Sequence, residues 1–117
     1  MALKPPDAPA LQRVEVEILD RVYRAALAVA VSRGDQLSAV ARQIMHRADE
    51  PEYAFMLKHL PAADRGPDDT RRKFRFGMPR DQYGEMKALV GAAGQSVARW
   101  IEYNLERYAD PDKPGKV

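Results

Sequence analysis

Residues 71–79, Arg-Arg-Lys-Phe-Arg-Phe-Gly-Met-Pro, alternate basic and apolar side chains, and this alternation decides the fold that we expect. Successive side chains of a β-strand point to opposite faces, so the pattern predicts a strand with one cationic and one apolar face. The cationic face carries Lys73, Arg75 and Gly77, and the apolar face carries Phe74, Phe76 and Met78. A strand this short cannot satisfy its own backbone hydrogen bonds, so we expect it to pair with its copy in a second subunit. This predicts a homodimer.

Two helices are predicted after this strand. Pro79 and Gly94 suit the two ends of the first helix, and Ser96 is a natural N-cap for the second, which ends near Asp110. The apolar stripe of the first helix is Tyr83, Met86, Leu89, Val90 and Ala93, and that of the second is Val97, Ile101, Leu105 and Tyr108. We expect a dimer core made of Phe74, Phe76, Met78, Leu89, Trp100, Ile101 and Leu105.

Positive charge is concentrated in one stretch of the chain. The net charge is only +2, and residues 1–60 are neutral, with eight Lys and Arg against eight Asp and Glu. Residues 70–80 hold five cations and no acid, namely Arg71, Arg72, Lys73, Arg75 and Arg80. Such a cluster is typical of a surface that binds phosphate groups, and a pair of strands has the width that a DNA major groove accepts. The alternative is an edge strand whose charges prevent aggregation.

The order of strand, proline, helix, Gly-Gln-Ser-Val turn and second helix resembles the ribbon-helix-helix family of DNA-binding proteins, of the MetJ and Arc repressor type, over about residues 71–108. The resemblance implies base contacts from Lys73, Arg75 and Gly77, and phosphate contacts from Ser96 and Val97. We add Arg71, Arg72 and Arg80 as further phosphate contacts. The buried charge triad of Arc falls on Gln95, Trp100 and Asn104, so we expect a more apolar core.

The first 60 residues predict helices. Apolar residues step by three or four from Leu11 through Val14 and Ile18, so we expect a long helix over about residues 10–33, and two more over 36–48 and 52–60. Residues 61–70 are predicted to be a linker, and residues 111–117 a disordered tail. No internal repeat is evident. The fold class that we expect is therefore mostly α, a ribbon-helix-helix unit preceded by a helical segment.

The predicted N-terminal helices leave two functions open. They suit a module that binds a protein partner or assembles dimers side by side on DNA. The alternative is a helix-turn-helix around Gly34, with residues 37–46 as the recognition helix, although its neutral charge does not favour contact with DNA.

Composition narrows the class of protein. The chain of 117 residues suits one ordinary domain, and without cysteine it forms neither disulfides nor thiolate metal sites. The longest apolar run, residues 25–31, is far too short to span a bilayer, and residues 1–10 lack the apolar core of a signal peptide. We expect a cytoplasmic protein without membrane contact.

Catalysis has little support in the sequence. His46 with Asp49 and Glu50 could form a metal site or an acid–base pair, but such a group is more often the polar end of a helix. We expect neither an enzyme nor a cofactor or metal. The function that we expect is a dimeric transcriptional repressor that binds duplex DNA. Alternatives of the same fold are an antitoxin, a plasmid partition protein or a relaxosome accessory protein, and the alternative of another class is an adaptor that only dimerises through this unit.

Overall fold

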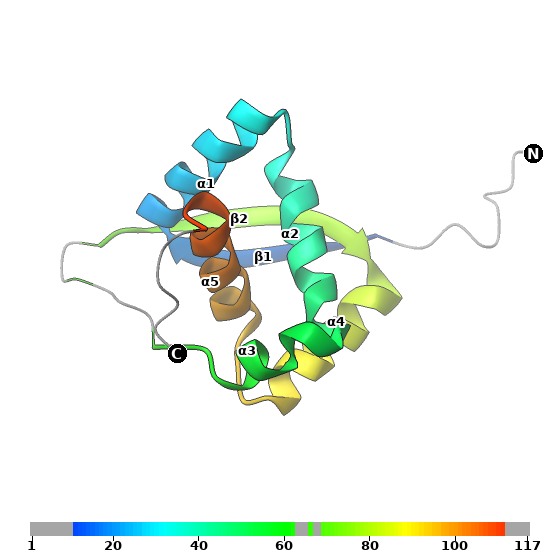
Figure 1. Ribbon diagram of the computed structural model, residues 1–117. Coiled ribbons are helices and arrows are strands. Elements are labelled where there is room, and N and C mark those ends of the chain that lie inside the picture. The colour runs from blue at the N-terminus through cyan, green and yellow to red at the C-terminus, as the bar shows by residue number, and fades with distance from the viewer. Residues whose placement is uncertain (1–10, 63–65, 67–68, 112–117) are drawn as a thin grey trace, which may run out of the picture.

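The computed structural model describes residues 11–62, 66 and 69–111, which form a two-stranded sheet with helices packed against one face (Figure 1). Most of the predicted tail and part of the predicted linker lie outside the described residues. The elements are β1 Leu11–Leu19, α1 Asp20–Arg33, α2 Leu37–His46, the 3-10 turns η1 Arg47–Asp49 and η2 Pro51–Tyr53, α3 Ala54–Lys58, β2 Arg71–Pro79, α4 Arg80–Ala92 and α5 Val97–Ala109.

The two strands of the sheet belong to the same chain. β1 pairs with β2 in antiparallel register, with Leu11 opposite Pro79, Glu15 opposite Arg75 and Leu19 opposite Arg71. The predicted fold class is therefore wrong, because the ribbon is not formed between subunits and is not preceded by a purely helical segment. With its backbone groups paired inside the chain, β2 has no need of a second subunit, and the reason for expecting a homodimer is removed.

The long helix predicted over residues 10–33 is also wrong in its first half. Residues 11–19 form β1, and the helix α1 begins only at Asp20. Val14, Val16 and Ile18 are buried and alternate with exposed charged residues, which is the period of two that a half-buried strand requires. Leu11, Val14 and Ile18 also fit helical steps of three and four, so a short segment satisfied both patterns. The β-branched residues at alternate positions favour the strand.

The chain contains the same strand-helix-helix unit twice. The first unit is β1, α1 and α2, and the second is β2, α4 and α5, displaced by 60 residues (71 − 11 = 60). Only three of the 36 positions compared, residues 11–46 against 71–106, are identical: Tyr23 and Tyr83, Ala28 and Ala88, Gly34 and Gly94. The repeat is therefore present in the structure although the sequence shows almost none of it.

The turn between the two helices is the best-preserved part of the repeat. Gly34 and Gly94 both adopt the left-handed conformation, with φ of 75° and 79°. The next residue donates its backbone N–H to the preceding helix in both turns, from Asp35 to Ala30 at 2.8 Å and from Gln95 to Val90 at 3.1 Å. Glycine is the residue that adopts this φ without steric cost, so the same helix ending arises twice.

The second helix of each unit packs on the strand of the other unit. α2 lies against β2 and α5 lies against β1, while α1 packs along α5. Trp100 of α5 is fully buried and donates its indole N–H to the carbonyl of Ile44 in α2 at 2.9 Å. Neither unit has a separate core, so the residues expected to form a separate N-terminal module instead share one hydrophobic core with the rest of the chain.

The predicted core residues are buried with one exception. Leu89 is 38% exposed, whereas the other six are at most 6% exposed and lie in the core of the single chain. The core is not purely apolar, since Glu102 and Asn104 are also buried. Glu102 is paired with Arg99 at 3.0 Å and accepts the backbone N–H of Leu19 at 2.9 Å, so its charge is compensated.

Among the described residues, no helix combines the length and the apolar character needed to cross a membrane.

We expect Phe74→Ala to destabilise the protein by about 3–5 kcal/mol, because Phe74 is 6% exposed and its ring contacts those of Tyr23 and Phe76. Phe55→Ala is the matched control, since Phe55 is 63% exposed and its removal should change stability by at most about 0.5 kcal/mol. Urea unfolding of both variants measures the difference. Equal losses would show that the apolar face of β2 is not the core.

Candidate nucleic-acid interface

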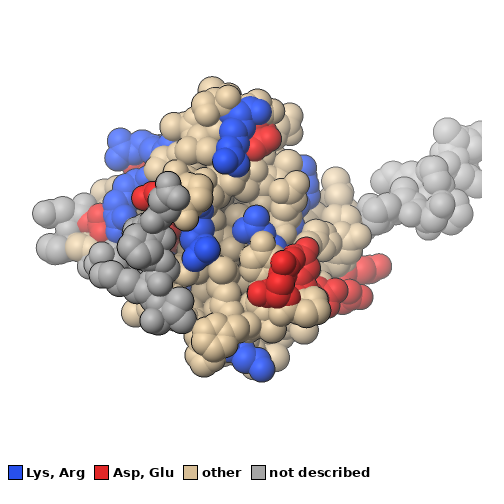
Figure 2. Space-filling view, in the orientation of Figure 1, with Lys and Arg blue, Asp and Glu red and all other residues tan. Residues whose placement is uncertain are grey.

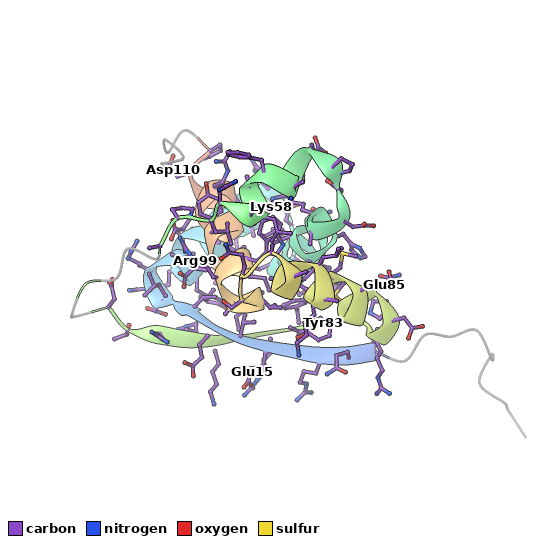
Figure 3. The ribbon with its side chains drawn as sticks, turned by 90° about the horizontal axis from the view of Figure 1, so that it is seen from below. Glu15, Lys58, Tyr83, Glu85, Arg99 and Asp110 are labelled. Carbon is purple, nitrogen blue, oxygen red and sulfur yellow. The ribbon has the colours of Figure 1, made fainter. Side chains whose placement is uncertain are left out.

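The face of the ribbon that points away from the helices is open to solvent. Figure 3 shows the strands edge-on, with the helices on one side and a row of side chains projecting from the other. Exposed residues alternate with buried ones along both strands, so the two faces are sharply different. The exposed side chains of this outer face are Leu11, Arg13, Glu15 and Glu17 from β1, and Arg71, Lys73 and Arg75 from β2.

The charges of the outer face are divided unequally between the strands. β2 contributes three cations, Arg71, Lys73 and Arg75, whereas β1 contributes Arg13 and two carboxylates. Glu17 lies opposite Lys73 in the register, so the acids face the basic strand. The outer face therefore has four cations and two acids, and a formal charge of +2 (4 − 2).

An ion pair occupies the centre of the ribbon. Glu15 lies directly opposite Arg75, and the Arg75 Nε donates to the Glu15 carboxylate at 2.6 Å. This hydrogen bond and the charge of Arg75 lower the pKa of the Glu15 carboxyl below its ordinary value of 4.5. The pair holds the Arg75 side chain across the ribbon while both residues remain exposed.

Gly77, which the resemblance assigns to base contact, opens a hollow in the outer face. The hollow is lined by Leu11, Gln12, Arg13, Arg75, Phe76 and Gly77. An added Cβ on Gly77 would meet no atom within 4 Å, so the missing side chain leaves open space rather than avoiding a clash. Its carbonyl accepts a hydrogen bond from Arg42 of α2 at 3.2 Å, which ties this end of β2 to the helices. Two arginines therefore flank a backbone segment that a ligand can approach closely.

The predicted phosphate contacts differ in their availability. Arg71 and Arg80 are exposed, but the Arg72 guanidinium is paired with Asp20 at 2.8 Å and stacks on the Tyr23 ring at 4.4 Å. Its position in the strand places Arg72 on the same side as Phe74, toward the helices. Arg72 therefore serves to join β2 to α1, and the sequence cluster of five cations overstates the charge that the outer face presents.

Ser96 and Val97 lie at the start of α5, beside the outer edge of β1. Ser96 is the N-cap, and its Oγ accepts the backbone N–H of Arg99 at 3.1 Å. A groove runs between this helix start and β1, lined by Glu15, Glu17, Lys87, Ser96, Val97 and their neighbours. The N-terminus of a helix favours negative groups, so this groove suits a phosphate, with Lys87 as an additional cation and the two carboxylates opposing it.

Arg13, Glu15 and Glu17 were not among the predicted site residues, although they form nearly half of the outer face. The signal that could have identified them is the alternation Val14-Glu15-Val16-Glu17-Ile18, which matches the period of residues 73–78. The same residues also fit helical spacing, and a helix predicted over residues 10–33 leaves no place for the second strand of the ribbon.

The helix-covered face offers a different surface. Figure 2 shows this face, with most of the visible acidic side chains gathered in one area and basic side chains spread over the rest. Asp49 and Glu50, the proposed neighbours of His46, are both exposed. In the part of the chain that the structure describes, no group of three or more His, Cys, Asp or Glu residues is placed to hold a metal ion.

We expect Arg75→Gln to raise the pKa of Glu15 toward its ordinary value, because the hydrogen bond and the charge that lower it are removed. In the wild type the stabilising effect of this pair is present above the ordinary carboxyl pKa and is lost as the pH falls through the lowered pKa. NMR titration of the Glu15 carboxyl carbon measures the change. Lys58→Gln, on the opposite side of the molecule, is the control; an unchanged Glu15 pKa in Arg75→Gln would contradict the pairing.

Comparison with known proteins adds no relative. No family model, no curated protein and no solved structure matches the chain.

Proposed function

We propose that this protein binds duplex DNA through the outer face of its intrachain ribbon and acts as a site-specific transcriptional repressor. The observation that carries the proposal is the ribbon itself: two paired strands of nine residues each, with helices on one face and exposed charged side chains on the other.

The shape of the ribbon supports the proposal. The major groove of B-DNA accepts a two-stranded β-ribbon, and its base edges present donors and acceptors that side chains can contact. Here the outer face carries long polar side chains at alternate positions, and apolar side chains are confined to the inner face except for Leu11.

The chemistry of the side chains supports it as well. Arginine and lysine donate to guanine O6 and N7, so Lys73 and Arg75 suit base contacts from β2. Arg71, Arg80 and Lys87 are exposed around the ribbon and suit phosphate groups. The start of α5, at Ser96 and Val97, lies beside the ribbon and can receive a phosphate on its flank.

Residues 71–108 resemble the ribbon-helix-helix family, and this resemblance agrees with the proposal. We include a relationship to that family in the proposal. That family uses two strands in the major groove, and this chain supplies both from one polypeptide. One chain is therefore sufficient to form the DNA-binding face. A repressor of this kind would act in the compartment that holds the DNA, and we propose the cytoplasm. Antitoxin, partition and relaxosome roles use the same contact with DNA and remain alternatives.

A second candidate function is a protein-interaction adaptor. Glu15 and Glu17 favour it, because two exposed carboxylates on the outer face repel phosphate groups. An adaptor would bind a partner with mixed charge and would show no affinity for DNA that depends steeply on salt concentration.

We expect Lys73→Ala combined with Arg75→Ala to weaken binding to a selected DNA duplex by at least about 10-fold, because each lost base contact costs about 1–3 kcal/mol. Fluorescence anisotropy at several salt concentrations measures the affinity and its salt dependence, which should become less steep where a phosphate contact is lost.

Lys58→Ala is the matched control, since Lys58 is an exposed cation on α3, on the side opposite the ribbon in Figure 3. It should bind as the wild type does. Equal losses in both variants would assign the effect to overall charge, and a wild type without any affinity for duplex DNA would favour the adaptor.

A further inference from the structure

We infer that the DNA site of this protein lacks two-fold symmetry, because the two halves of the ribbon carry different side chains at equivalent positions. This inference rests on the proposed function and specifies the class of DNA that the ribbon recognises. It comes from the repeat within the chain, combined with the side chains of the outer face.

The register of the strands establishes which positions are equivalent. Residue numbers of paired residues add up to 90, as in 11 + 79, 15 + 75 and 19 + 71, and the two units differ by 60. A two-fold rotation about the centre of the ribbon, between Glu15 and Arg75, therefore exchanges β1 with β2. Under this rotation Arg13 takes the place of Lys73, Glu15 that of Arg75, and Glu17 that of Gly77.

Only the first of these exchanges, Arg13 for Lys73, preserves the charge of the side chain. Arg13 and Lys73 are both cations and both suit guanine. Glu15 replaces a cation by an acid, and Glu17 replaces the bare backbone of Gly77 by a carboxylate. In a ribbon made from two identical subunits, each side chain would occur twice and the site would be palindromic, whereas here the covalent link between the units allows them to differ.

The half of the ribbon around Lys73 and Arg75 suits guanine. The bond from Arg75 to Glu15 uses Nε, and no described residue accepts a hydrogen bond from the two terminal nitrogens of Arg75. These nitrogens can donate to one guanine. Glu15 acts here as a positioning residue, since it holds the guanidinium across the centre of the ribbon.

The outer face of β1 suits a different base pattern, and its Glu17 lies directly opposite Lys73 of β2. The Glu17 carboxylate is an acceptor only, and among the bases it suits the N4 amino group of cytosine. At the far end, Arg13 and Arg75 flank the hollow over Gly77, where a base edge can approach the backbone. The outward charge is −1 on β1 (1 − 2) and +3 on β2. If the protein bound its site in the opposite orientation, the acidic strand would face the bases that suit the basic strand, and the basic strand would face those that suit the acidic one.

Selection from a random duplex pool tests the inference. We expect the wild type to enrich a single motif that is not palindromic. A variant with Arg13→Lys, Glu15→Arg and Glu17→Gly gives β1 the outer-face residues of β2 at these positions, and we expect it to enrich a motif closer to a palindrome. If this variant does not fold, as judged by circular dichroism, the inference is tested by whether the motif enriched by the wild type is palindromic.

The outcomes separate this inference from the proposed function. Enrichment of a palindrome by the wild type would overturn the inference and leave DNA binding intact. Binding without enrichment of any motif would also overturn it. Absence of binding to any duplex at low salt would remove the proposed function, and the inference with it.

The orientation of the bound protein gives an independent measurement. The chain has no cysteine, so Thr70→Cys provides one attachment point for a DNA-cleaving iron chelate, just before β2 and beside the Arg71 end of the ribbon. On a non-palindromic site the protein binds in one orientation, and we expect cleavage on one side of the motif. Cleavage of equal strength on both sides would show that the two orientations are equivalent and would overturn the inference.

Discussion

The antiparallel pairing of β1 with β2 is the constraint on which the rest of the structure depends. Each strand has one buried and one exposed face, and neither can satisfy its backbone groups alone. Because the partner strand lies 60 residues earlier in the same chain, the ribbon forms without a second subunit. The segment between the strands must return the chain to β1, and two of its helices, α1 and α2, pack against the sheet on the way.

The pairing is reinforced by polar bonds that cross from each second helix to the strand of the other unit. Arg42 of α2 donates to the Gly77 carbonyl of β2, and Glu102 of α5 accepts the backbone N–H of Leu19 in β1. These two residues occupy equivalent positions in the repeat (42 + 60 = 102), yet one is a donor and the other an acceptor. Equivalent helix positions therefore bind the strand of the other unit with opposite chemistry, and they do so at strand positions that are not equivalent, since Gly77 corresponds to Glu17 and not to Leu19.

The sequence predicts the second unit better than the first for a physical reason. In residues 71–79 aromatic and basic side chains alternate without ambiguity, and β2, α4 and α5 occupy the residues for which a strand and two helices are predicted. In residues 11–19 the alternating Val14, Val16 and Ile18 continue into the helical spacing of α1, so local periodicity favours one long helix. The partner of a strand is a long-range property, and with three identities in 36 positions the repeat could not reveal it. Because β1 is not predicted as a strand, its outer-face residues Arg13, Glu15 and Glu17 are absent from the predicted site.

On the proposed function, the charges of the outer face determine which kind of DNA contact the ribbon can support. Non-specific affinity increases with the number of phosphates neutralised, and an outer face with a formal charge of +2 contributes little of it. A carboxylate that faces the phosphate backbone weakens binding to every sequence, whereas one that faces a cytosine amino group weakens binding only to other bases. Glu15 belongs to the central pair of the ribbon and Glu17 lies two residues away, opposite Lys73, so in the proposed major-groove complex both would lie near base edges. On the proposed function they would disfavour incorrect sequences, and the low net charge would contribute specificity rather than affinity.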